Sequence, residues 1–283
     1  MVPARSARRL ESLAVLDRAD SRDRPIRVMD LSDVSWLDPV HLVGIAATAH
    51  LAARQGSRLR LTGLEDDQAV YAARMHLGQV IEQFGGEHEL PVVREHDRHD
   101  SLLEIQPLRT REDVRQLTAL VYDKVAAESG EVAHALHLAL AEVGSNVCDH
   151  SRTIGFMAAQ TIAEHGVLRF AVADSGVGLL GTLAGLGATD DQAALRMALS
   201  GTSRTQAPGH GNGLTAAVEI VSSLDGEVLL ASGDAATSSN AHGRQQRMLG
   251  ARFQGTIFEG SVPAGSTARS ARHPVRTTGE VKQ

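Results

Sequence analysis

Cysteine and lysine are almost absent from this sequence. Cys148 is the only cysteine among 283 residues, so no intrachain disulfide can form, and a reducing compartment is expected. Lys124 and Lys282 are the only lysines, and no GxxxxGK[ST] phosphate loop is present. Chemistry that needs a lysine at any other internal position is therefore excluded.

Long apolar runs and a positive charge balance are also missing. The longest apolar stretch, 41–53, is short and holds two histidines, so we expect no membrane-spanning segment. The start, MVPARSARRL, is basic but has no apolar run behind it, which does not fit a secretory signal. A net charge of −6 argues against a broad nucleic-acid surface. We expect a cytoplasmic protein without membrane or nucleic-acid partners.

What is present has globular composition, with 42% hydrophobic and 22% charged residues. Residues 1–24 form a charged N-terminal segment. Residues 25–98 carry a strand at 26–32, a helix at 37–56, a strand at 58–64 and one or two helices within 65–85. This alternation predicts a parallel or mixed sheet. The polar run 85–100 marks a domain boundary.

Residues 99–263 show a second pattern, in which helices and strands come in pairs. The expected elements are a strand at 102–109, helices at 111–128 and 131–151, a hairpin from 155–162 and 166–176, a glycine-rich stretch over 176–213, a helix at 214–224, a strand at 226–232, a polar loop at 233–249 and a last strand at 251–261. The tail 264–283 lacks periodicity, and we expect it to be disordered.

The helix at 131–151 has two distinct faces. An apolar stripe is formed by Val132, Leu136, Leu140, Val143 and Val147. Glu142, Asn146 and Asp149 are spaced four and three residues apart, so they share another face. That face could simply be solvated. It carries no Lys or Arg, however, and two acids with an amide are typical oxygen ligands for Mg²⁺.

The segment FAVADSGVGLLG (170–181) ends a predicted strand at Asp174 and continues with Gly176 and Gly178. GVGLLG also matches the GxGxxG dinucleotide motif. That motif requires a second parallel strand about 20 residues later. The sequence AGLGATDD at that distance does not resemble a strand, so we disfavour a dinucleotide site. A plain glycine turn remains the structural alternative.

A third segment, SGTSRTQAPGHGNGLTAAVEIV (200–221), places alternating glycines before a helix. Gly209, Gly211 and Gly213 would present backbone N–H groups to an anion at the helix N-terminus. Side-chain donors could come from Thr202, Ser203, Arg204 and His210. A flexible loop is the alternative.

These segments, in this order, resemble the GHKL, or Bergerat-fold, ATP-binding superfamily. EVGSN (142–146) resembles its E-x-x-x-N box, DSGVG (174–178) its D-x-G-x-G box, and GHGNGL (209–214) its G-x-G-x-G box. FQGTIFEGSVP (253–263) resembles the closing strand, in which Gly255 and Thr256 would lie near adenine. The resemblance covers about 102–263 and implies an α/β fold of the two-layer α+β sandwich type.

The resemblance also implies roles for individual residues. Asn146 would hold Mg²⁺, Glu142 would be the general base, and Asp174 would accept a hydrogen bond from the adenine amino group. Gly176 and Gly178 would let the backbone approach the base, and 209–213 would wrap the phosphates. The full set expected to bind the nucleotide is Asn146, Asp149, Asp174, Gly176, Gly178, Thr202, Ser203, Gly209, His210, Gly211, Asn212, Gly213, Leu214 and Thr256.

The first domain resembles STAS domains, the anti-sigma-antagonist fold, over residues 28–64. Where phosphorylatable STAS domains carry an acceptor serine, this sequence reads Asp38-Pro39-Val40-His41. Ser35 is nearby but off that position. We therefore expect a scaffold or docking role for this smaller α/β domain. The histidine-rich run 87–99 fits no standard metal spacing and is interpreted as a solvated linker.

The resulting hypothesis is an ATP- and Mg²⁺-dependent switch or serine kinase of the anti-sigma type. Its expected partner is a STAS protein or another sigma-factor regulator, and a homodimer is compatible with the sequence. No helical hairpin with a phosphoacceptor histidine precedes the ATP-binding segment, which excludes a complete histidine kinase. Two alternatives stay open: a nucleotide-gated binding module without phosphotransfer, and a slow ATPase.

Overall fold

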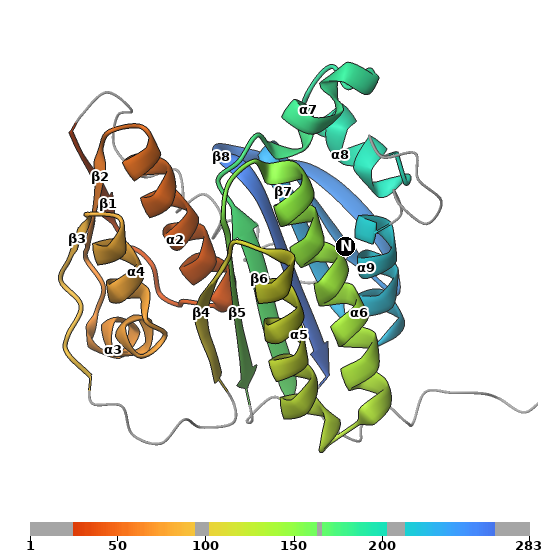
Figure 1. The fold of residues 1–283 in the computed structure, drawn as a ribbon, viewed down its shortest axis with the longest axis horizontal. Helices are drawn as coiled ribbons and strands as arrows, with labels where there is room; N and C mark the ends of the chain where they lie inside the picture. Colours follow the sequence, from red (N-terminus) through yellow and green to blue (C-terminus); the bar gives the residue numbers. More distant parts are fainter. Residues whose placement is uncertain (1–24, 94–101, 163–165, 203–212, 264–283) are drawn as a thin grey trace, which may run out of the picture.

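The chain forms a mixed α/β structure with two sheets (Figure 1). The computed structural model describes residues 25–93, 102–162, 166–202 and 213–263. A three-stranded sheet has the order β1-β2-β3, and a five-stranded sheet has the order β4-β5-β6-β8-β7. No helix in these ranges is long and apolar enough to cross a membrane.

The N-terminal unit (25–93) confirms the predicted parallel sheet. Its elements are β1 (Ile26–Asp30), α2 (Pro39–Arg54), β2 (Arg58–Thr62), α3 (Asp66–Arg74), α4 (Leu77–Gln83) and β3 (Glu87–His88). Both strand pairs are parallel. The stretch 65–85 forms two helices because His76 adopts a left-handed backbone between them, with φ of 65°. The polar run expected as a linker begins with β3, where Glu87 forms an ion pair with Arg60 of β2.

The second unit contains the antiparallel sheet and its covering helices. Its elements are β4 (Leu102–Leu108), α5 (Arg111–Ala126), α6 (Gly130–Asn146), a π-helical turn η2 (Val147–Ser151), β5 (Gly155–Ile162), β6 (Val167–Asp174), α7 (Gly178–Leu183), a 3-10 turn η4 (Ala184–Leu186), α8 (Asp191–Leu199), α9 (Gly213–Ser223), β7 (Glu227–Asn240) and β8 (Gly243–Pro263).

Two segments of this unit differ from the prediction. The expected loop 233–249 is strand, because β7 and β8 continue as a long hairpin that turns between Asn240 and Gly243. Small side chains there are buried, including Ala235 and Ala236, so a run that looks polar still packs. The glycine-rich stretch 176–213 contains α7 and α8. The α8 N-terminus is capped by Asp190, whose Oδ1 accepts a hydrogen bond from Ala193 N at 2.7 Å.

The five-stranded sheet is buried on both faces. In β5, Phe156 and Ala158 contribute to one apolar core, whereas the alternate residues Met157 and Ala159 contribute to the other. Helices α5, α6 and α9 cover the second face, and α2 of the N-terminal unit packs against β5, β6 and β8 on the first (Figure 1). The predicted two-layer sandwich is therefore incomplete, because α2 adds a third layer.

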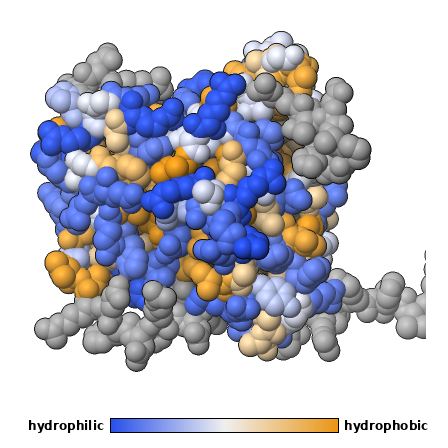
Figure 2. Space-filling view, viewed as in Figure 1, coloured by the Kyte–Doolittle hydropathy of each residue, from blue (hydrophilic) through white to orange (hydrophobic). Residues whose placement is uncertain are grey.

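Polar contacts reinforce the contact between the two units. Asp38, before α2, forms an ion pair with Arg169 of β6. Arg74 Nη1 lies 2.7 Å from Glu104 Oε1, and both side chains are largely buried. The Tyr71 hydroxyl donates to Gln160 Oε1 at 2.8 Å. The outer face of the helices of the second unit is not covered by another layer of the described structure, and its surface is mainly hydrophilic (Figure 2).

Candidate functional site

A cavity of about 270 Å³ gathers most of the predicted site residues that the structure describes. They come from segments far apart in the sequence and comprise Glu142, Asn146, Asp149, Asp174, Gly178, Thr202, Gly213, Leu214 and Thr256. Gly176 does not line this cavity but supports Asp174. The remaining predicted residues, namely Ser203, Gly209, His210, Gly211 and Asn212, lie outside the described residues, as does Arg204.

Helix α6 supplies one wall of the cavity. The helix begins after Ser129, whose hydroxyl accepts a hydrogen bond from Val132 N at 3.3 Å. Its predicted apolar stripe is buried throughout, which fixes the rotation of the helix about its axis. Glu142 and Asn146 are one turn apart, and both line the cavity. The local helix pattern therefore determines which polar groups face the cavity.

The acidic face of α6 is not free of positive charge once the chain folds. Arg111, the first residue of α5, holds Asp149 through Nη2 contacts of 2.9 and 2.8 Å to the two carboxylate oxygens. The face itself carries no Lys or Arg, as the sequence indicated, but Arg111 reaches it from the neighbouring helix.

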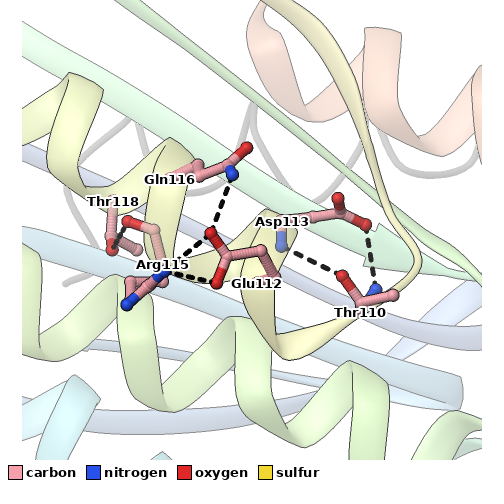
Figure 3. Close-up of polar contacts among 6 residues, drawn as sticks. All are labelled: Thr110, Glu112, Asp113, Arg115, Gln116 and Thr118. Carbon is pink, nitrogen blue, oxygen red and sulfur yellow. Dashed lines mark hydrogen bonds and ion pairs between the residues drawn. The ribbon is translucent and has the colours of Figure 1, made fainter.

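A capping box fixes the start of α5 and therefore the position of Arg111 (Figure 3). Asp113 N donates to Thr110 Oγ1 at 3.1 Å, and Thr110 N donates to Asp113 Oδ2 at 2.9 Å. In the same first turn, the carboxylate of Glu112 pairs with Arg115, three residues further along. Hydrogen bonding to Arg115 and Gln116 lowers the pKa of Glu112. Arg111 thus lies at the cavity rim beside a well-defined helix N-terminus.

Asp174 lies at the opposite wall, at the end of β6, and is 4% exposed. Its Oδ1 accepts a hydrogen bond from Gly176 N at 2.8 Å, and the Thr256 N–H also bonds to the carboxylate. Burial nevertheless raises the pKa of Asp174 to about 7. Among the described residues, no cation contributes to its pKa. This carboxyl group therefore has capacity for a further hydrogen-bond donor.

Two glycines lie in close contact with residues of the site. A Cβ at Gly176 would lie 2.0 Å from Ser151 O, so any larger residue would displace the turn after Asp174. A Cβ at Gly213 would lie 2.2 Å from Glu142 Oε2. The N-terminus of α9 therefore lies directly against the Glu142 carboxylate, and both belong to one compact wall.

The strand directions rule out the dinucleotide interpretation of GVGLLG. In the described sheet β6 pairs only with β5 and β8, and both pairings are antiparallel. A helix, α7, does begin at Gly178. A dinucleotide site needs a parallel strand beside β6, and none of the described strands next to β6 is parallel to it.

His150 and Ser151 also line the cavity but were not among the predicted site residues. Both belong to η2, where the π-helical turn changes the direction of side chains after Asn146. His150 could have been found from its spacing, four residues after Asn146. Arg111 could not, because its approach depends on how α5 packs against α6.

The described residues contain no cluster of three His, Cys, Asp or Glu side chains that could hold a metal by itself. Asn146 and Glu142 nevertheless offer oxygens on one wall. A cation there would need ligands from another molecule to complete its shell. The cavity can thus accommodate a ligand that presents a hydrogen-bond donor at Asp174 and oxygens near α6.

No protein-family model matches this sequence, and no curated protein is significantly similar to it.

Proposed function

We propose that the cavity binds ATP together with Mg²⁺, in a GHKL-like unit over 99–263 that follows a STAS-like unit over 25–98. The observation that carries this proposal is Asp174, a buried carboxyl group with two backbone donors and no charged partner in the described structure. The adenine amino group would be its third donor. Thr256, opposite Asp174 in the β6–β8 register, would lie beside the same base.

The donors present fit the second component of the ligand. The amide oxygen of Asn146 would ligate Mg²⁺, and phosphate and water oxygens would complete the octahedral shell that this ion prefers. The ion neutralises phosphate charge when bound. Glu142 lies one turn away on the same wall, and we assign it the general base that orients or deprotonates an attacking hydroxyl or water.

We further propose that the protein is a regulatory switch or serine kinase of the anti-sigma type. The burial of the STAS-like acceptor region favours a substrate on another chain over phosphorylation of this one. Asp38 is buried in contact with Arg169, and His41 is 3% exposed. That position is closed by the sheet, so phosphorylation there would require the two units to separate. The proposed partner is therefore a separate STAS protein or sigma-factor regulator.

Nucleotide selectivity tests the binding proposal. Guanine places a carbonyl where adenine has its amino group, so the Asp174 carboxylate would face an acceptor. We expect calorimetry with Mg²⁺ at pH 8, where Asp174 is ionised, to give an ATP preference over GTP of up to about 10⁴. Asp174→Asn should remove most of that preference, and Asn146→Ala should reduce only the Mg²⁺-dependent part of ATP affinity. Equal affinities for ATP and GTP would contradict the proposal.

Turnover separates a kinase or ATPase from a nucleotide-gated binding module. Glu142→Gln keeps the side-chain volume but removes the base, so ATP affinity should persist while hydrolysis or phosphotransfer falls by roughly 10²–10⁴. Labelled ATP and a candidate STAS partner provide the assay. Turnover that is unchanged in the variant would remove Glu142 from the mechanism. Binding without turnover in the wild type would favour the gated module.

A further inference from the structure

A second cavity, of about 410 Å³, lies between the two units on the other side of residues 174–178. The last turn of α2 forms one side, with Arg54 and Gln55, and residues 151–152 form another. Ser175, Gly176 and Val177 line it as well. Ser151 lines both this cavity and the candidate nucleotide cavity. We call this second cavity the interunit cavity.

The described residues that line the interunit cavity carry charge of one sign. Arg54 and Arg152 are the charged ones among them, and none is a carboxylate. Within the described parts of the chain, neither guanidinium forms an ion pair or a hydrogen bond. Both side chains are exposed, so an anion from solution can reach them. Their planar N–H groups match the oxygens of phosphate particularly well.

The backbone at Arg152 gives an independent reason to connect its side chain with a ligand. Arg152 ends η2 in the left-handed conformation, with φ of 60°. Glycine or asparagine adopts this conformation more readily at the end of a helix. The left-handed backbone at this arginine is held by its neighbours, since Val177 N donates to Ser151 O at 3.2 Å and Thr153 N donates to Ser151 Oγ at 3.0 Å. A left-handed backbone of this kind is typical of residues whose side chain is used for binding.

The surrounding polar groups are already paired, which leaves the two arginines to bind a ligand. Gln254 Nε2 donates to Gly176 O at 2.7 Å, and Ser151 Oγ donates to Thr153 O at 2.8 Å. The Ser175 hydroxyl lies 3.3 Å from His50 Nδ1 of α2. These contacts fix the walls of the hollow and attach α2 to the turn after Asp174. The negative end of the α2 helix dipole disfavours an anion, but Arg54 lies in the last turn and offsets it.

We propose that the interunit cavity is an anion site for a phosphate monoester, held by Arg54 of one unit and Arg152 of the other. Such a group could belong to a small metabolite or to a phosphorylated side chain of a protein. The site is separate from the nucleotide cavity and does not depend on the function proposed for that cavity. Its ligand would connect the two units across the wall formed by 174–178.

Titration of inorganic phosphate into the full chain without nucleotide tests this site. Calorimetry at constant ionic strength should show saturable binding that chloride does not reproduce. Arg54→Gln and Arg152→Gly should each weaken it by roughly tenfold or more. Glycine is chosen at 152 because it keeps the left-handed backbone, so the midpoint of thermal unfolding should not fall. Arg58→Gln, an exposed charge on β2, is the matched control and should leave phosphate affinity unchanged.

Phosphate that binds both variants as tightly as it binds the wild type would overturn the proposal. Affinity that is lost only in Arg111→Gln would overturn it as well and would place the ion in the nucleotide cavity. Binding that chloride matches would overturn it as well. Amide NMR spectra of the wild type provide a test that needs no variant: phosphate should shift the signals of Ser175 and Val177, and unshifted signals would contradict the site. Glycerol phosphate compared with a phosphoserine peptide then identifies the source, since the true source should bind more tightly.

Discussion

Asp38 and Asp174 are both buried carboxyl groups, but the chain surrounds them differently. Asp38 is 6% exposed, forms an ion pair with Arg169, and accepts a hydrogen bond from Trp36 Nε1 at 2.8 Å. Asp174 is 4% exposed and has backbone donors but no cation near it in the described structure. A carboxylate with a full set of partners stabilises a fold. One with incomplete partners remains available for a ligand, at a cost in stability.

Removing the charge at Asp38 should have the largest effect on stability. Asp38→Ala leaves Arg169 largely buried without its partner, and the Arg169 Nε already has no hydrogen bond in the described structure. We expect the free energy of unfolding, measured with urea, to fall by about 3–5 kcal/mol. In the double variant Asp38→Ala/Arg169→Met, the loss should be smaller than in Asp38→Ala alone. A loss below about 1 kcal/mol in Asp38→Ala would show that the pair is not structurally important.

Asp174 should make stability depend on pH in a defined direction. The folded protein keeps the proton up to about pH 7, whereas an unfolded aspartate loses it near pH 3.8. The stabilisation that comes from this proton is complete below pH 3.8 and is lost as pH rises through 7. The total loss in the free energy of unfolding is at most about 4 kcal/mol. Asp174→Asn should remove this part of the pH dependence and be more stable than the wild type at pH 8. Parallel stability curves for the two proteins between pH 4 and 8 would contradict the assignment.

The pair of Arg111 and Asp149 should have the smallest effect on stability. The two side chains are 63% and 31% exposed, so solvent screens their attraction. Arg111→Gln should change the free energy of unfolding by less than about 1 kcal/mol, and added salt should reduce the difference further. Thermal unfolding at low and high salt measures this. A larger, salt-independent loss would mean that Arg111 supports the cavity wall through packing.

Local sequence patterns predicted the parts of the fold that depend on local physics. The apolar stripe on α6 located Glu142 and Asn146 on one wall, and the strand ending at Asp174 located the opposite wall. The hairpin at 233–249 was missed because its buried residues are small or hydroxylated and carry little hydrophobic signal. Arg111 was missed because its role arises from packing between helices. No local pattern predicts which helix face meets another.

The covering of the sheet by α2 could in principle have been predicted. Twelve of its sixteen residues are buried, and a helix that is apolar on all sides requires partners on all sides. The three short strands of the β1-β2-β3 sheet cover only one side of α2. The prediction treated the two units separately, so the second partner of α2 was not considered.

The packing of α2 against β5, β6 and β8 also has a consequence for the order of events during synthesis. Residue 54 leaves the ribosome about 200 residues before the last strand, β8, is complete. At about 5–20 residues per second, the sheet-facing side of α2 stays without its partner for on the order of ten seconds or more. During that interval the apolar, sheet-facing side of α2 lacks the partner that covers it in the folded protein, which is a condition that favours aggregation of nascent chains.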